Sequence, residues 1–183
     1  MGFISNPLYA PSYSVEGDEV AHILTSKGGI TVSLDGPGAP IHVANFCELA
    51  EAGFYDGLKF HRYVPGFVIQ GGCPHTRAMT PEDVAAGKAG KDGRPGTGGP
   101  GYRIHEEFTT NPRNLHDDGA LAMARSQDPN SAGSQFYLCL GPQHQLDSGY
   151  TVFGRTIDGL NVIEALRAGD TIQSIRIEHA AKS

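Results

Sequence analysis

The pattern of hydrophobic and polar positions along the chain predicts mainly short β-strands. Residues 20–34 hold two alternating runs, VAHILT and ITVSL, on either side of Gly28 and Gly29. Adjacent glycines supply the positive φ angles that a tight hairpin turn requires, so we expect a β-hairpin here. Residues 60–72 predict a strand that is interrupted at Pro65-Gly66 and then resumes. Further short β-like runs occupy residues 120–124, 134–140, 151–155 and 172–177.

Helical spacing occurs twice. Pro40 suits the first turn of a helix, where its missing N–H is not needed, and apolar residues then repeat at helical intervals from Val43 to Ala50 before Gly53 offers a stop. A second helix is expected over 160–168, ended by Gly169, with these side chains buried: Leu160, Ile163, Ala165 and Leu166. Many short strands with two isolated helices favour a closed antiparallel β-barrel, because closure removes the unpaired edges of a sheet.

The length of 183 residues suits one domain with a sizeable core. Residues 1–18 are rich in Pro, Ser and Tyr without periodicity, which predicts an N-terminal arm that is either poorly ordered or laid over the domain surface. The domain then covers 19–183. Within it, residues 73–101 form a long Gly- and Pro-rich loop, in which Thr80 before Pro81 predicts a cap and one helical turn.

Composition narrows the class of protein. Lys and Arg number 14 and Asp and Glu number 20, so the net charge of −6 offers no general attraction for nucleic acid or for an anionic membrane. No apolar run approaches the roughly 18 residues that span a bilayer, and the N-terminus lacks the basic start and apolar block of a secretory signal. Cys47, Cys73 and Cys139 are odd in number and far apart, which indicates reduced thiols in a cytoplasmic protein.

Residues that often carry chemistry lack the necessary patterns here. The histidines have no metal-binding spacing, so we expect surface or internally satisfied side chains at His61, His75, His105, His116 and His144. The carboxylate pairs Glu106-Glu107 and Asp117-Asp118 are expected to be solvated loop charges. Gly96-Thr97-Gly98-Gly99 lacks the Lys-Ser/Thr of a phosphate-binding loop, and Cys139 lies in the apolar run FYLCL and is expected to be buried packing. We therefore expect neither metal nor cofactor.

One stretch remains, FHRYVPGFVIQGG at 60–72. If its first half is a strand, Phe60, Arg62 and Val64 share a face, which places a guanidinium among apolar neighbours. The stretch alone leaves an alternative open, an edge strand with a solvated arginine.

The motifs taken together resemble the cyclophilin-type peptidyl-prolyl cis-trans isomerases. They follow one another in the family's order over about residues 20–178: FHRYVPGFVIQGG at 60–72, GTGG at 96–99, GALAMAR at 119–125, NSAGSQFYLCL at 130–140 and LDSGYTVFGR at 146–155. The resemblance implies an eight-stranded antiparallel β-barrel, closed, with an α-helix capping each end.

The resemblance also implies a site. Residues of the usual type occupy the positions of Arg62, Phe67, Gln70, Ala124, Gln135 and Leu146. Five positions depart from the common residue: Val68 for Met, Tyr137 for Phe, Arg125 for Asn, Gln145 for Trp and Tyr150 for His. We expect Arg62, Phe67 and Gln70 to be catalytic and the others to bind substrate, Arg125 through its backbone. The Tyr137 hydroxyl must find a partner if it is buried.

The implied activity is rotation about X-Pro peptide bonds, which assists protein folding and needs no cofactor. Expected partners are proline-containing peptides and unfolded or partly folded proteins, with the chain itself a monomer, and with weakened cyclosporin binding because Gln145 replaces the family's Trp. Tyr137 and Gln145 keep open an alternative, a module that binds proline peptides with little turnover.

Overall fold

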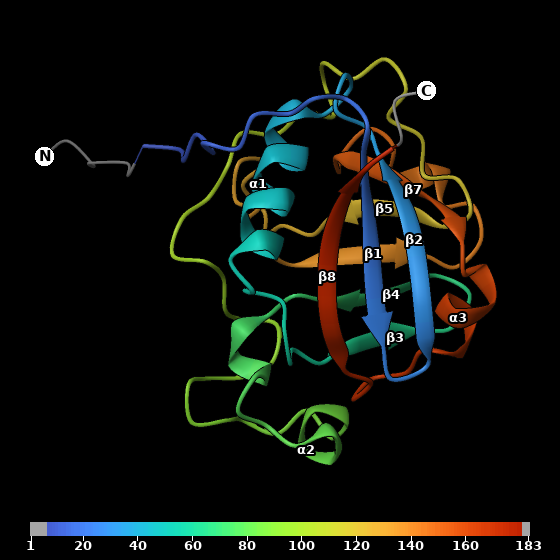
Figure 1. Cartoon of the computed structure of the whole chain (residues 1–183). Helices are drawn as coiled ribbons and strands as arrows, with labels where there is room; N and C mark the ends of the chain where they lie inside the picture. The colour runs from blue at the N-terminus through green and yellow to red at the C-terminus, as the bar shows by residue number, and fades with distance from the viewer. Residues whose placement is uncertain (1–6, 181–183) are drawn as a thin grey trace, which may run out of the picture.

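A strongly curved antiparallel sheet forms the body of the computed structural model, which describes residues 7–180 (Figure 1). Its eight strands are hydrogen-bonded in the order β3-β4-β6-β5-β7-β2-β1-β8. The strands are β1 Glu19–Thr25, β2 Gly28–Leu34, β3 Arg62–Val64, β4 Val68–Gly71, β5 Ala120–Met123, β6 Phe136–Cys139, β7 Val152–Asp158 and β8 Ile172–His179. The helices are α1 Pro40–Glu51, α2 Pro81–Ala85 and α3 Leu160–Ala165, with 3₁₀ turns at Pro74–Thr76 and His144–Leu146. The predicted hairpin, interrupted strand and eight-stranded antiparallel sheet are confirmed.

Closure of this sheet into a barrel is not confirmed. The hydrogen-bonded order ends at β3 and β8, so the named strands form an open, curled sheet. An antiparallel bridge between Lys59 and Thr171 joins the segments that precede these two strands, where the Phe60 N–H donates to the Asp170 carbonyl at 2.8 Å. Because this pairing is antiparallel, the residues after Lys59 lie opposite those before Thr171, so β3 and β8 leave the bridge in opposite directions and do not pair with each other.

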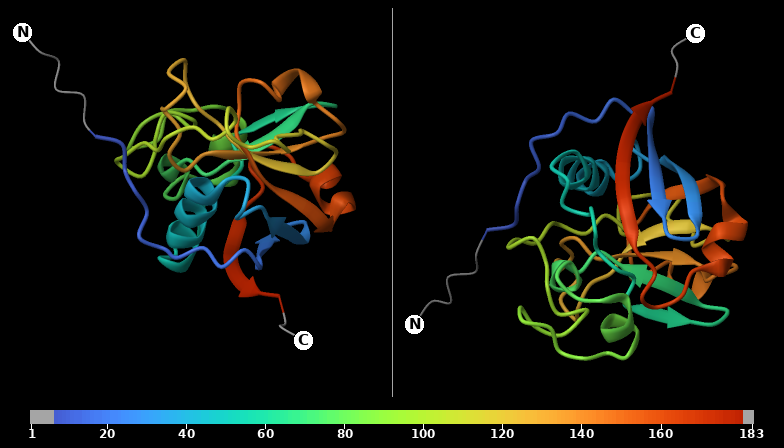
Figure 2. Two further views of the ribbon diagram at one scale, coloured as in Figure 1. Left: turned by 90° about the horizontal axis from the view of Figure 1, so that it is seen from above. Right: turned by 60° about the horizontal axis from the view of Figure 1, so that its bottom comes forward.

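The main core lies between the concave side of the sheet and α1. Phe46 of α1 contacts Tyr55, Phe136 and Phe153, with ring centroids 5.2, 5.8 and 5.3 Å apart. Figure 2 shows α1 beside the open side of the curved sheet. These large side chains are fully buried, so α1 supplies the apolar surface that this side of the sheet requires.

A second apolar cluster lies on the other face of the central strands. In β6 all four residues are buried: Phe136 and Leu138 belong to the main core, whereas Tyr137 and Cys139 belong to the second cluster. This division follows from the two-residue period of a strand. Loop side chains pack against the second cluster, namely Phe67, Ala124, Leu146 and Tyr150.

Helix α3 is shorter than its sequence pattern predicts. It ends at Ala165 and not at residue 168, and Leu166 already has extended backbone. Ile163 and Leu166 are buried as expected, but Leu160 is 41% exposed and Ala165 is exposed, so their predicted burial is wrong. A helix of six residues makes fewer than two turns and presents only a narrow stripe to the sheet.

The N-terminal segment 7–18 lies along the domain and passes α1, as both views in Figure 2 show. The Tyr9 N–H donates to the Arg103 carbonyl at 2.8 Å, and the Tyr9 hydroxyl donates to Glu48 of α1 at 2.5 Å. Residues 1–6 of the predicted arm lie outside the described residues. Over the described range 7–180, no helix combines the length and apolar character needed to cross a membrane.

The long loop 73–101 holds the predicted helical turn. The Thr80 side chain accepts a hydrogen bond from the Asp83 N–H at 3.1 Å and begins α2 at Pro81. The later part of the loop contacts the start of β6, where the Gly96 and Gly98 carbonyls accept hydrogen bonds from the side chain of Gln135.

Candidate active site

A cavity of about 270 Å³ opens over the second apolar cluster. Nine residues line it, and all of them are residues that the sequence assigned to the site: Arg62, Phe67, Val68, Gln70, Ala124, Arg125, Tyr137, Leu146 and Tyr150. They come from β3, β4, β6 and the loops after β5 and before β7, so the curvature of the sheet brings distant segments together. Gln135 lies beside the cavity, and Gln145 is exposed outside it, where it donates to the Gln143 side chain at 2.9 Å.

Arg62 stands at the mouth of this pocket. It is directly opposite Gln70 in the β3-β4 pairing, and its guanidinium carbon lies 5.9 Å from the centre of the Phe67 ring. Its Nη1 is 3.5 Å from Gln70 Oε1, a long contact that leaves most of the donors of the guanidinium open. Arg62 is thus both exposed to solvent and placed against an apolar ring.

A relay of amide groups orients Gln70. Its Nε2 donates to Gln135 Oε1 at 3.1 Å, which turns the Gln70 carbonyl oxygen toward Arg62. Gln135 Nε2 in turn donates to the main-chain carbonyls of Gly96 and Gly98, at 2.9 and 2.8 Å. The glycine-rich GTGG motif therefore supports the active-site amides.

Val68 and Tyr137 form the apolar floor. Tyr137 is only 4% exposed, and its ring meets that of Tyr150 edge to face with centroids 6.1 Å apart. Burial raises the pKa of Tyr137, so its hydroxyl stays protonated. The expected partner of this hydroxyl is found: His116 Nε2 lies 2.9 Å away.

Arg125 contributes a side-chain role that the sequence did not predict. Its Nε donates to the Gly149 carbonyl at 2.8 Å, and its guanidinium carbon lies 4.6 Å from the centre of the Tyr150 ring. The N–H of the neighbouring Ala124 already donates to the Gln135 carbonyl at 2.9 Å. A peptide contact at this wall must therefore use other main-chain groups than the Ala124 N–H.

A second cavity of about 340 Å³ adjoins the first and shares Gln70, Ala124 and Arg125 with it. Its walls are polar segments around Gly96–Pro100 and Ser131–Gln135. The two cavities therefore adjoin along these three shared residues.

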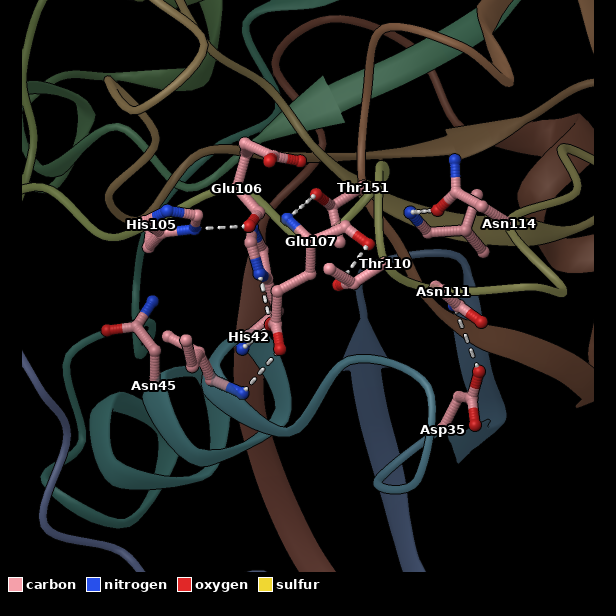
Figure 3. Close-up of polar contacts among 12 residues, drawn as sticks. Asp35, His42, Asn45, His105, Glu106, Glu107, Thr110, Asn111, Asn114 and Thr151 are labelled. Atoms are coloured by element: carbon pink, nitrogen blue, oxygen red, sulfur yellow. Dashed lines mark hydrogen bonds and ion pairs between the residues drawn. The ribbon is translucent and has the colours of Figure 1, made fainter.

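Glu107 corrects the expectation that the paired carboxylates are solvated. It is 4% exposed and accepts hydrogen bonds from the Ile41 and His42 N–H groups at 3.1 and 2.8 Å, and from His42 Nδ1 at 2.7 Å (Figure 3). The first N–H groups of a helix have no partner within it, and a carboxylate at this end is stabilised by the helix dipole. Glu107 therefore caps α1 and is not available as a catalytic acid.

His42, His116 and Cys139 have structural roles. His42 and His116 are buried and hydrogen-bonded. Burial raises the pKa of the Cys139 thiol to about 12, so it remains protonated at neutral pH and is a poor nucleophile.

An apolar pocket for a small ring, a guanidinium at its mouth and an adjoining groove for extended backbone define a class: a β-rich protein that binds peptides at a proline. The comparisons with known proteins agree. The family described as cyclophilin type peptidyl-prolyl cis-trans isomerase/CLD matches residues 20–182. The chain therefore belongs to the cyclophilin-type peptidyl-prolyl cis-trans isomerase family, and its activity is isomerisation of X-Pro bonds.

Curated relatives and solved structures carry the same description. A peptidyl-prolyl cis-trans isomerase of Synechococcus elongatus is 44% identical over 84% of this chain and 92% of that protein. Peptidyl-prolyl cis-trans isomerase B of Bacillus subtilis is 41% identical over 85% and 95%. A Cryptosporidium parvum cyclophilin type peptidyl-prolyl cis-trans isomerase, crystallised in the presence of the dipeptide Ala-Pro, has a TM-score of 0.68 and 27% identity over 88% of this chain and 99% of that one.

Proposed function

We propose that this isomerase works through Arg62, with the ring of the substrate proline held over Val68 and Tyr137. The observation that carries this assignment is the guanidinium at the mouth of an apolar pocket, oriented by Gln70 and beside the Phe67 ring. Phe67 and Gln70 complete the catalytic group.

The chemistry requires no covalent bond to the protein. The partial double bond of X-Pro sets a barrier of roughly 18–20 kcal/mol to rotation. As the bond twists, the proline nitrogen becomes pyramidal and gains a lone pair, so a donor placed there stabilises the twisted state more than the planar one. Arg62 supplies this donor, because its planar guanidinium offers several N–H donors and no acceptor.

The pocket adds the second contribution. Phe67, Tyr137 and Leu146 exclude water from the proline ring and the twisting bond, and water favours the polar planar amide over the twisted one. A millionfold acceleration needs about 8 kcal/mol, a size that preorganised donors and desolvation together reach.

The substrates we propose are proline-containing peptides, including the exposed segments of unfolded or partly folded proteins. Support comes from the two adjoining cavities at the site and from the Ala-Pro dipeptide named with the Cryptosporidium parvum relative. We further propose that the protein acts as a monomer in the cytoplasm, with three reduced thiols, which are free and buried here.

One assay distinguishes the active isomerase from the alternative, a proline-peptide binding module with little turnover. Exchange NMR on a short peptide with an Ala-Pro bond measures cis-trans interconversion and binding together. We expect cross peaks between the two isomers at catalytic amounts of protein. Binding of the peptide without any faster exchange would favour the binding module.

A further inference from the structure

Three hydrogen-bonded side chains run behind the floor of the proline pocket: His116 and Tyr137 are buried, and Asp147 is partly exposed. His116 is fully buried, and its Nδ1 lies 2.8 Å from Asp147 Oδ1 while its Nε2 lies 2.9 Å from the Tyr137 hydroxyl. The rings of His116 and Tyr137 are nearly parallel, with an interplanar angle of 13°. The isomerisation mechanism derived above uses none of these hydrogen bonds.

The partners fix the roles of both ring nitrogens. The Asp147 carboxylate only accepts hydrogen bonds, so His116 Nδ1 carries the proton and donates it. Nε2 is then an acceptor, and the Tyr137 hydroxyl must donate to it. Burial lowers the pKa of His116 despite the opposing influence of Asp147, which keeps this neutral tautomer in place near neutral pH.

Asp147 connects these side chains to the opposite wall of the pocket. It directly follows the 3₁₀ turn that carries Leu146, and it also accepts from the His116 N–H at 2.7 Å. Asn114 holds this segment from the other side, since its Nδ2 donates to the carbonyls of Asp147 and Tyr150 at 2.6 and 2.8 Å.

We propose that His116 is a positioning residue for the proline pocket: it fixes the Tyr137 floor through the phenol hydroxyl and, through Asp147, ties that floor to the wall of Leu146 and Tyr150. This inference rests on the proposed function for the identity of the pocket. The inference is particular to this protein, because the hydroxyl belongs to Tyr137, which replaces the family's usual Phe.

Several charged and titratable groups lie close to the hydrogen-bonded side chains of Tyr137, His116 and Asp147. Asp147 faces His116 from the 3₁₀ turn, and His144 reaches the second oxygen of Asp147 at 2.9 Å. Asp117 follows His116 in sequence and lies 3.4 Å from His144. Tyr150 and the Arg125 guanidinium approach the floor itself, and so does the Cys139 thiol: all three influence the pKa of Tyr137.

Two substitutions distinguish the His116–Tyr137 hydrogen bond from the His116–Asp147 hydrogen bond. The amide nitrogen of Asn occupies nearly the place of histidine Nδ1, so His116→Asn keeps a donor for Asp147 and removes the acceptor for Tyr137. Tyr137→Phe removes the hydroxyl from the other side. The double variant His116→Asn/Tyr137→Phe leaves neither group facing a missing partner.

The test is a titration of each variant with a short Ala-Pro peptide by NMR, followed by the exchange rate at saturation. We expect each single change to weaken binding by about tenfold, because the floor is no longer held in place by one buried hydrogen bond, and to lower the exchange rate of the bound peptide by a smaller factor. The double variant should bind no worse than the poorer single variant, because the two changes break the same interaction. Tyr55→Phe is the matched control, since it also removes a buried hydroxyl with a 2.9 Å hydrogen bond but lies in the main core; its affinity should stay at the parental value.

Multiplied losses in the double variant, or parental affinity in a folded His116→Asn protein, would overturn the proposal. The ¹⁵N chemical shifts of His116 in the parent test it even where a variant does not fold: we expect the neutral Nδ1–H tautomer at pH 7, and an Nε2–H tautomer would contradict it. A parent that binds the peptide without accelerating exchange would overturn the proposed function, while the affinity comparison would still decide the role of His116.

Discussion

Arg125 ties two sides of the pocket together at the scale of a single side chain. Its Nε bond to the Gly149 carbonyl and its position over the Tyr150 ring anchor the loop before β7 to the end of β5. The Asn that is common at this place in the family is too short to reach both. Arg125, which replaces the family's Asn, therefore packs against Tyr150, which replaces the family's His.

Gln145 carries the first prediction. It is exposed and lies outside the pocket, so replacing it by Trp, the residue common in the family, adds a broad apolar face without disturbing the core. We expect Gln145→Trp to strengthen cyclosporin binding by about 1–3 kcal/mol, since aromatic surface is gained at the rim. Isothermal titration measures the change, and isomerase activity should stay near the parental value.

Gln145→Leu serves as the comparison, because it adds apolar surface without the indole N–H, and it should gain less affinity. Equal cyclosporin affinity in the parent and in Gln145→Trp would show that residue 145 is not part of the inhibitor surface.

Side-chain identities in the site were predictable where a motif fixes them, but their supporting contacts were not. Tyr137 was expected to need a partner, yet nothing in the sequence indicates His116, which is 21 residues away and looked like one of several scattered histidines. The prediction that Glu107 is a solvated loop charge was wrong for the same reason, since the N–H groups that donate to it lie 65 and 66 residues earlier, at the start of α1. Such contacts depend on tertiary packing and leave no local pattern.

At the scale of elements, one glycine allows β4 to end against β6. Gly72 has a φ of +96°, and a Cβ there would lie 2.5 Å from the Ser134 carbonyl oxygen and 3.0 Å from Gln135 Cα. Both atoms belong to backbone that cannot move without shifting Gln135, which orients Gln70.

We therefore expect Gly72→Ala to lower the free energy of unfolding by about 2–4 kcal/mol, combining a left-handed backbone with a steric clash. Urea unfolding measures this loss. Gly57→Ala is the control, because Gly57 has a φ of +82° with no atom near the added Cβ, so only the backbone cost of about 1–2 kcal/mol applies. An equal loss in the two variants would contradict the close approach at Gly72.

The elements themselves followed from local patterns more often than their extent did. Glycine turns and two-residue alternation located the hairpin, and Pro40 and Thr80 marked two helix starts. The end of α3 was misplaced by three residues, at Ala165 and not at residue 168, since apolar residues continue past the helix into the turn before β8. Barrel closure was not predictable, because it depends on how the two end strands of the sheet, β3 and β8, approach each other in space and not on the pattern within either strand.

At the scale of the whole molecule, buried histidines couple stability to pH. Burial, helped by the charge of Arg62, lowers the pKa of His61 to about 4, and burial also lowers that of His116. The folded state thus keeps both neutral while the unfolded chain takes up protons near the usual pKa of about 6.5. Stability is therefore fully present above pH 6.5 or so and falls as the pH drops toward 4.

The loss from His61 alone should be on the order of 3 kcal/mol between these limits. Urea unfolding of the parent and of His61→Gln at pH 7, 5.5 and 4.5 or so measures it, and the variant should lose less stability on acidification. Identical pH dependence in the parent and in His61→Gln would show that His61 does not titrate below its usual range.

The role of Arg62 is the central claim about the whole enzyme, and exchange NMR on a short Ala-Pro peptide tests it most directly. Arg62→Ala should lower kcat/KM by two to three powers of ten, about 3–4 kcal/mol of transition-state stabilisation. Arg62→Lys should also be costly, because the ammonium lacks the planar fork and reach of the guanidinium. Peptide binding should weaken far less, since Phe67, Tyr137 and Leu146 still line the pocket. Near-parental turnover in an Arg62→Ala protein that melts like the parent would contradict the mechanism.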